Sequence, residues 1–250
     1  MSEDPWQKLK SFTDARIALG RSGGSLKTHQ MLQFRKDHSL ARDAVWANLD
    51  SNRLVEQLAP LNLEVIRLNS QAKDRASYIK RPDLGRKLDD ASIEHLKSSV
   101  HEAYHVTICI ADGLSALAIE RHAFNFLVCL MPIMKPYRLA PITVVSQGRV
   151  AISDEIGSLL KSKLSIILIG ERPGLSSPDS MGIYLTYQPQ KGNTDERRNC
   201  ISNIRKEGLS YEFAASKLSF LISESLRRKL SGVDLKDTFD ANTSLPPDLM

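Results

Sequence analysis

The sequence predicts an α/β fold: a Rossmann-like parallel sheet flanked by helices, with a mainly helical N-terminal region. Three observations predict it. Short apolar runs rich in Ile, Val and Leu recur after residue 105 and end at glycines or polar residues. Stretches of helical length and periodicity separate these runs, which is the pattern of βαβ units. The first hundred residues have helical periodicity without this alternation, so we place a domain boundary near residue 100.

The N-terminal region is predicted to contain helices and one strand. Met1–Phe12 predicts a short peripheral helix. A longer helix is predicted from Thr28, because its hydroxyl can cap a helix and apolar residues follow at helical spacing. Leu63–Leu68 alternates apolar and polar residues, as a half-exposed strand does. A further helix is predicted from Asp90 or Ser92.

Four apolar runs predict the strands of the parallel sheet. The run Leu164–Gly170 is unbroken and rich in Ile, and it stops at a glycine, so we expect it to be buried on both faces. The other three runs are Val106–Ala111, Ile142–Ser146 and Gly182–Tyr187. Helices are predicted between and after these strands, through residues 117–130, from Ser153 and from Ser210.

Two polar segments predict neither a strand nor a helix. Lys191–Lys206 is polar and basic, and we interpret it as a connection between the last strand and the last helix. The end of the chain is polar and contains two adjacent prolines. We therefore expect residues 236–250 to form a flexible tail.

Polar and turn-forming residues follow the ends of the predicted strands. Asp112 and Gly113 end one strand, 148–150 end the next, and Glu171 and Arg172 follow the Ile-rich strand. Because the carboxyl ends of parallel strands meet at one edge, and ligands bind in the crevice there, this edge is the predicted cofactor site. The pattern alone leaves an alternative open, in which Glu171 and Arg172 pair with each other at a solvated strand end.

Composition limits the classes of function. The chain is 42% hydrophobic and 25% charged, with a net charge of +5, as in an ordinary globular protein. Aromatic residues make up only 6%, and no stacking motif indicates nucleic-acid binding. No stretch approaches the roughly 20 apolar residues that span a bilayer, so we expect no membrane contact. The three cysteines lack metal-ligand spacing and suit a reducing, cytoplasmic compartment.

Common catalytic signatures are missing from the sequence. No G-x-S-x-G elbow surrounds Ser115 or Ser176, and no G-x-G-x-x-G follows a predicted strand. Cys200 lies near Arg197 and Arg198, whose charges can lower the pKa of a thiol and make it nucleophilic. A packed or hydrogen-bonded thiol explains the same pattern. A stand-alone α/β enzyme with a Cys200 nucleophile therefore stays open as an alternative.

Five short motifs occur in a fixed order along the chain. The motifs are Arg81-Pro-Asp-Leu-Gly-Arg86, Ala111-Asp-Gly-Leu-Ser115, Gly148-Arg-Val150, Gly170-Glu-Arg-Pro-Gly-Leu175 and Cys200-Ile-Ser-Asn-Ile204. Each motif is short, and it is their order and separation that make the set specific. Together they resemble one family, the small (light) subunit of ethanolamine ammonia-lyase, over roughly residues 15–233.

The resemblance implies a subunit of a radical enzyme. The family's enzyme uses adenosylcobalamin to convert ethanolamine to acetaldehyde and ammonia. Its large subunit holds the substrate, and the small subunit covers the cofactor, so this chain is expected to work in a hetero-oligomer and not alone. In this interpretation residues 1–100 dock onto the large subunit, residues 101–235 bind cobalamin and residues 236–250 form the tail. A purely structural assembly subunit is the remaining alternative.

The resemblance also implies the site residues. Val150, Glu171 and Cys200 carry the family's cobalamin contacts, while catalytic residues and metal ligands are expected to be absent from this chain. Arg149 and Arg172 are second-rank candidates for the nucleotide phosphate of the cofactor. The chain lacks the Asp-x-His-x-x-Gly motif that supplies a histidine to cobalt in some cobalamin enzymes. We therefore expect the cofactor to keep its own benzimidazole as the lower ligand.

The resemblance bears on location as well. Family members often carry a longer N-terminal extension, which is linked in some cases to enclosure in a bacterial microcompartment. Here the recognisable part begins near Ala15, after a short polar lead. We expect a cytoplasmic protein, with microcompartment enclosure as the alternative.

Overall fold

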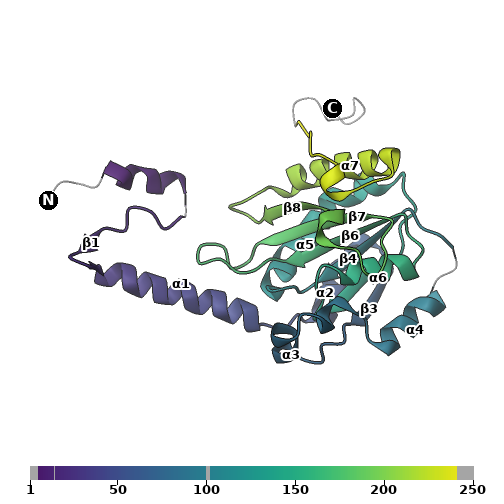
Figure 1. Ribbon diagram of the computed structural model, residues 1–250, viewed down its shortest axis with the longest axis horizontal. Coiled ribbons are helices and arrows are strands. Elements are labelled where there is room, and N and C mark those ends of the chain that lie inside the picture. The colour runs from purple at the N-terminus through teal and green to yellow at the C-terminus, as the bar shows by residue number, and fades with distance from the viewer. Residues whose placement is uncertain (1–4, 14, 100–101, 241–250) are drawn as a thin grey trace.

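The chain folds around a six-stranded sheet, which Figure 1 presents in a ribbon diagram of the computed structural model. The structure describes residues 5–13, 15–99 and 102–240. From one edge of the sheet to the other, the strand order is β3-β5-β4-β6-β7-β8. The strands are β3 (Val65–Asn69), β4 (Val106–Ala111), β5 (Ile142–Ser146), β6 (Leu164–Gly170), β7 (Met181–Tyr187) and β8 (Arg198–Ile204).

The sheet is mixed and mostly parallel, which confirms the predicted α/β class. Strands β3, β5, β4 and β6 pair in parallel. Strand β7 is antiparallel to β6, and β8 is antiparallel to β7. The expectation of a wholly parallel sheet is wrong at β7. The physical reason is the short connection 171–180, which contains no helix and therefore returns as a hairpin, since a parallel crossover needs a dozen or more residues.

Helices cover both faces of the sheet. On one face, α2 (Ser51–Leu58), α5 (Ala116–Met134) and α7 (Tyr211–Arg228) share a core with alternate strand residues such as Ile108 and Ile166. On the other face, α4 (Asp90–Ser99) and α6 (Ile152–Leu159) pack on the intervening residues, among them Cys109 and Ile167. This division follows from the two-residue period of strands. We call the two cores the α5 core and the α6 core.

The remaining elements are short or lie outside the sheet. They are α1 (Thr28–Trp46), α3 (Arg75–Lys80), the two-stranded ribbon β1 (Arg21–Ser22) and β2 (Ser25–Leu26), and the 3₁₀ helices η1 (Pro5–Phe12), η2 (Ala59–Leu61), η3 (Leu84–Arg86), η4 (Asp195–Arg197) and η5 (Gly232–Asp234). In Figure 1, η1, β1 and α1 extend away from the sheet as an N-terminal arm.

Helix α5 corrects one expectation from the sequence. By length and composition this helix could cross a membrane, although no such stretch is predicted from the apolar runs. In the structure it is a core helix. Phe126, Leu127 and Leu130 are fully buried in the α5 core, and the helix packs against β6 and α7. Its hydrophobicity is explained by packing inside the protein.

The predicted domain boundary stays a prediction. It falls at residues 100–101, which lie outside the described residues, as does the end of the tail, 241–250. Strand β3 lies before this boundary and pairs with β5 beyond it, so the N-terminal region contributes to the common sheet. The predicted strand at 63–68 and the helix from Thr28 are confirmed within one or two residues.

Candidate functional site

The centre of the sheet contains a topological switch point. Strand β4 continues into α5 on one face, and its neighbour β5 continues into α6 on the other face. The two connections therefore separate at the carboxyl ends of β4 and β5. Open α/β sheets bind ligands at such points. The residues at these two strand ends determine what this one can do.

Asp112, at the end of β4, joins the two strand ends. Its carboxylate accepts hydrogen bonds from the backbone N–H groups of Gln147 at 2.9 Å and Gly148 at 3.0 Å. Arg75 forms an ion pair with it at 3.5 Å, and the exposed fractions of the two side chains are 4% and 1%. Burial raises the pKa of Asp112 to about 6, because the loss of hydration outweighs the stabilising charge of Arg75.

Tyr78 completes this arrangement between two guanidinium groups. The Arg75 guanidinium lies 4.6 Å and that of Arg149 4.2 Å from the centre of the Tyr78 ring, which are cation–π distances. The Tyr78 hydroxyl donates to the Gly148 carbonyl at 3.2 Å, and Arg149 Nη2 donates to the Tyr78 carbonyl at 3.1 Å. Arg149 is therefore engaged within the protein. We call Arg75, Tyr78, Asp112, Gln147 and Arg149 the switch-point cluster.

Val150 follows this cluster at the entry to α6. Its half-buried side chain packs against the α6 core. Its carbonyl accepts hydrogen bonds from the Ser153 hydroxyl at 2.9 Å and the Ser153 N–H at 3.2 Å. The backbone of Val150 is therefore held in place by α6, and its remaining exposed surface is apolar.

Glu171 lies where β6 ends, and two glycines shape its surroundings. A Cβ on Gly170 would lie 2.0 Å from the Ser115 carbonyl oxygen, so only glycine fits there. The Glu171 carboxylate accepts hydrogen bonds from the Ser180 hydroxyl and, at 3.2 Å, from the Asn203 N–H. It lies above Gly182, where a Cβ would be 2.8 Å from Glu171 Oε1. The carboxylate is thus folded back over β7.

The alternative of a Glu171–Arg172 ion pair is not supported. Among the described residues, the ion pairs do not include one between these two side chains. Glu171 instead receives donors from two other segments of the chain. It is half-buried, and a carboxylate oxygen has room for further donors.

Cys200 lies on an edge strand that the sequence does not predict. The segment Lys191–Lys206, interpreted as a connection, contains β8, whose outward residues are polar because one of its faces is exposed. Cys200 pairs with Tyr184 of β7 in the strand register, so the two side chains lie side by side on the same face of the sheet. Cys200 keeps exposed surface, but the partial loss of hydration raises the pKa of its thiol, which makes the thiol a poorer nucleophile.

The arginines beside Cys200 do not activate it. Arg198 is buried and forms ion pairs with Asp154 and, at 2.6 Å, with Asp195. Its guanidinium therefore neutralises one carboxylate of α6 and one of η4. The charge that lowers the pKa of Cys200 most is that of Lys217, and it is outweighed by burial and by the Glu171 carboxylate.

Glu171 and Cys200 come together on one surface through Tyr184. Tyr184 pairs with Cys200 across β7 and β8, and the charge of Glu171 acts on both side chains. Tyr184 and Val150 both pack at the margin of the α6 core. We call Val150, Glu171, Tyr184 and Cys200 the open-face site. Sequence reasoning missed Tyr184. The signal that could have found it is a phenolic hydroxyl in the middle of the apolar run Gly182–Tyr187.

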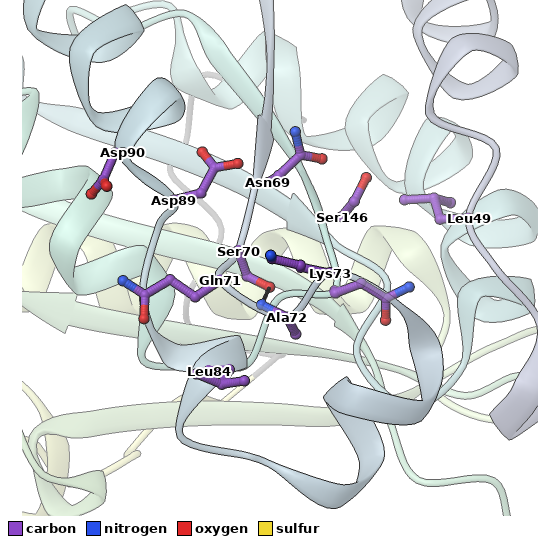
Figure 2. A pocket seen from close by; sticks show the side chains of 11 residues that line it. Leu49, Asn69, Ser70, Gln71, Ala72, Lys73, Leu84, Asp89, Asp90 and Ser146 are labelled. Atoms are coloured by element: carbon purple, nitrogen blue, oxygen red, sulfur yellow. Dashed lines mark hydrogen bonds between the residues drawn. The ribbon is translucent and has the colours of Figure 1, made fainter.

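A separate cavity lies at the edge of the sheet. It has a volume of about 840 Å³ and lies at the carboxyl ends of β3 and β5. Figure 2 shows Asn69, Ser146 and Asp89 around it, with Lys73 reaching in from the segment after β3. None of the three sequence-predicted site residues lines this cavity. It offers a cation and two carboxylates, whereas the open-face site offers a carboxylate, a hydroxyl and apolar surface.

The described residues contain no group of three or more His, Cys, Asp or Glu side chains placed to hold a metal ion. His122 is the most buried histidine among them, and it bonds to the Tyr211 hydroxyl at 2.8 Å. Burial lowers the pKa of His122. Its other ring nitrogen lies 3.5 Å from Asp179, in the connection after Glu171. This contact ties that connection to α5.

Comparison with known proteins gives a consistent result. The family model described as "Ethanolamine ammonia-lyase light chain (EutC)" matches residues 3–236. The chain is 50% identical over 247 residues to the ethanolamine ammonia-lyase small subunit of Pseudomonas fluorescens strain Pf-5, covering 97% of this chain and 90% of that protein. It is 51% identical over 241 residues to the same subunit of Azotobacter vinelandii, covering 94% and 89%.

Proposed function

The chain belongs to the ethanolamine ammonia-lyase light-chain family, and from this premise we propose that it binds adenosylcobalamin together with the large subunit. It is the small subunit of a carbon–nitrogen lyase. The name "small subunit" that its relatives carry implies a large-subunit partner. The observation that supports the proposal is that Glu171, which lies above Gly182, and Cys200, which pairs with Tyr184, share the α6 side of the sheet, where Val150 also packs. Val150, Glu171 and Cys200 are the three positions that the family resemblance marks for the cofactor.

The chemistry of the open-face site fits this cofactor. Cobalamin carries amide side chains around its corrin ring, and amide N–H groups are donors that need acceptors. Glu171 accepts such donors through a carboxylate that is half-buried and already oriented by Ser180 and Asn203. Val150 and the ring of Tyr184 supply apolar surface for the ring edge. The chain needs no metal ligands of its own, because the corrin holds the cobalt.

This chain's contribution to catalysis is binding and orientation. When bound, adenosylcobalamin supplies the radical chemistry by which ethanolamine is converted to acetaldehyde and ammonia. The Glu171 carboxylate fixes the rotation of the cofactor through its amides, and the Tyr184–Cys200 surface excludes water from one side. The switch-point cluster keeps Val150 in position, because Asp112 holds the backbone immediately before it. Substrate contacts belong to the large subunit.

The N-terminal arm is the proposed docking element, as part of a region 1–100 that precedes the cofactor region 101–235. It exposes several large apolar side chains, including Phe12, Leu32, Leu40 and Trp46. A helix that extends from the body with such residues gains free energy when they are buried against a partner. The large subunit is the partner that the family implies.

Reconstitution tests the proposed function. The large subunit and this chain are purified separately and together, and each preparation is assayed for cobalamin binding and for acetaldehyde production from ethanolamine. We expect both activities only in the two-chain complex. Full activity of the large subunit without this chain would contradict the proposal. A complex that assembles but binds cobalamin equally well with Glu171→Gln would leave a purely structural role.

A further inference from the structure

We propose that Tyr184 is a fourth cofactor contact, and that Glu171, Tyr184 and Cys200 form a platform for the amide-bearing edge of the corrin ring, not for the phosphate-bearing nucleotide tail. This inference rests on the proposed function. It adds a residue that neither the sequence motifs nor the family resemblance identifies. It also assigns the platform to one chemical part of a large ligand.

The positions of the three residues follow from the strand register. Tyr184 pairs with Ile167 of β6 on one side and with Cys200 of β8 on the other. Neighbouring strands are about 4.8 Å apart, so the Tyr184 ring lies between them on the α6 side of the sheet. Gly182 is two residues earlier on β7 and shares this face. Because Gly182 has no side chain, the Glu171 carboxylate fits above it, beside the ring.

This part of the sheet is open on the α6 side. Helix α6 packs on β4 and β6, while α7 covers β7 and β8 from the opposite face. Cys200 is exposed and Tyr184 is only half-buried. A surface with an aromatic ring, a hydroxyl, a thiol and a carboxylate is therefore available on the α6 side of the sheet.

Charge decides which part of the cofactor fits. The carboxylates of Glu171 and Asp195 both raise the pKa of Tyr184, so the charges that act on its hydroxyl are negative. The cation that acts on the pKa of Cys200 is Lys217, and it is paired with Asp237. A phosphodiester would be repelled here, whereas neutral amide N–H₂ groups would be attracted and hydrogen-bonded. The geometry thus favours the corrin edge.

Two ligands separate the two parts of the cofactor. Hydroxocobalamin has the nucleotide tail, and cobinamide has the corrin ring and its amides without the tail. Both are titrated by absorbance into the purified two-chain complex, carrying either the wild-type chain, Tyr184→Ala or Tyr184→Phe. We expect Tyr184→Ala to weaken the binding of both ligands by the same factor, about tenfold, and Tyr184→Phe by about fivefold, since one hydrogen bond contributes about 1 kcal/mol.

Tyr187 provides the matched control. It lies on the same strand but packs on the α5 core, at the opposite face of the sheet. Tyr187→Phe should leave both affinities unchanged. If Tyr184→Ala prevents assembly, Tyr184→Phe and Tyr184→Leu carry the test.

The outcomes distinguish this inference from the proposed function. Weakening of hydroxocobalamin alone would assign the platform to the tail and overturn the inference, as would unchanged affinities in an assembled Tyr184→Ala complex. If Glu171→Gln weakens both ligands while Tyr184→Ala weakens neither, only this inference fails. If neither substitution affects the binding of either ligand, both this inference and the proposed function of the open-face site fail.

Discussion

Two polar regions lie at the carboxyl edge of the same sheet and use their polar groups differently. In the switch-point cluster, Asp112 and Arg75 are almost fully buried and are bonded to groups of the same chain. In the open-face site, Glu171 and Cys200 retain exposed surface and spare bonding capacity. The first region fixes the geometry of a strand end, and the second is free to bind a ligand. The number of polar residues at a strand end does not distinguish a structural role from a ligand-binding role. The burial of those residues does.

The largest effect is expected from removing the central carboxylate of the switch-point cluster. Asp112→Ala leaves two buried backbone N–H groups and the Arg75 guanidinium without their acceptor. Breaking a buried ion pair from one side costs about 3–5 kcal/mol, so the free energy of unfolding should fall by about that amount in urea titrations. Asp83→Ala, at the exposed Arg81–Asp83 pair, is the control and should change little. A small loss for Asp112→Ala would mean that the cluster is not structural.

The pH dependence of stability sharpens the same comparison. Burial raises the pKa of Asp112 to about 6 from 3.8, so the folded state binds this proton more tightly than the unfolded state. The stabilising contribution is therefore complete below about pH 4 and is lost as the pH rises toward 6. A shift of about two pKa units corresponds to about 3 kcal/mol. The difference in unfolding free energy between the wild type and Asp112→Asn should decline over this interval, and a constant difference would contradict the assignment.

The sequence predicts the parts of the molecule that local patterns determine. The strand ends at Asp112, Gly148 and Glu171 follow from apolar runs that stop at glycines or polar residues, and a parallel sheet brings such ends together. The buried ion pair between Asp112 and Arg75 could not be predicted. The two residues are far apart in the chain, and the sequence does not distinguish a buried arginine from an exposed one.

Strand β8 and Tyr184 escaped prediction for a related reason. An edge strand with one exposed face carries polar residues, and Cys200 and Asn203 therefore resemble loop residues. The antiparallel turn at 171–180 is what brings β7 and β8 beside Glu171. Without that topology, Tyr184 is an unremarkable aromatic residue in an apolar run. Glu171, Tyr184 and Cys200 come together only through the arrangement of the strands, which a local sequence pattern does not reveal.

A smaller effect is expected from crowding the open-face site. In Gly182→Ala, the new Cβ would lie 2.8 Å from Glu171 Oε1, so the carboxylate must move. We expect the cobalamin affinity of the two-chain complex to fall by about threefold to tenfold, because a displaced acceptor loses about one hydrogen bond. Gly192→Ala is a poor control, since Gly192 has a positive φ; Gly24→Ala, with open space around it, is suitable. An unchanged affinity would indicate that Glu171 is not engaged with the cofactor.

The smallest effect is expected at the thiol. Cys200→Ala removes a thiol that lies beside Tyr184 in the strand register, and the cobalamin affinity should fall by about twofold to threefold, in keeping with the loss of one weak donor. The turnover of ethanolamine at saturating cobalamin should be retained. Complete loss of turnover would instead support the alternative in which Cys200 is a nucleophile.

The central claim is that this chain holds cobalamin through Glu171, and one measurement tests it directly. The dissociation constant of hydroxocobalamin is compared between two-chain complexes containing the wild-type chain and Glu171→Gln, with the unfolding of both checked in urea. The account predicts affinity about tenfold weaker in the variant, as expected for losing a charged hydrogen-bond acceptor, with nearly unchanged stability. Equal dissociation constants in two equally stable complexes would contradict it.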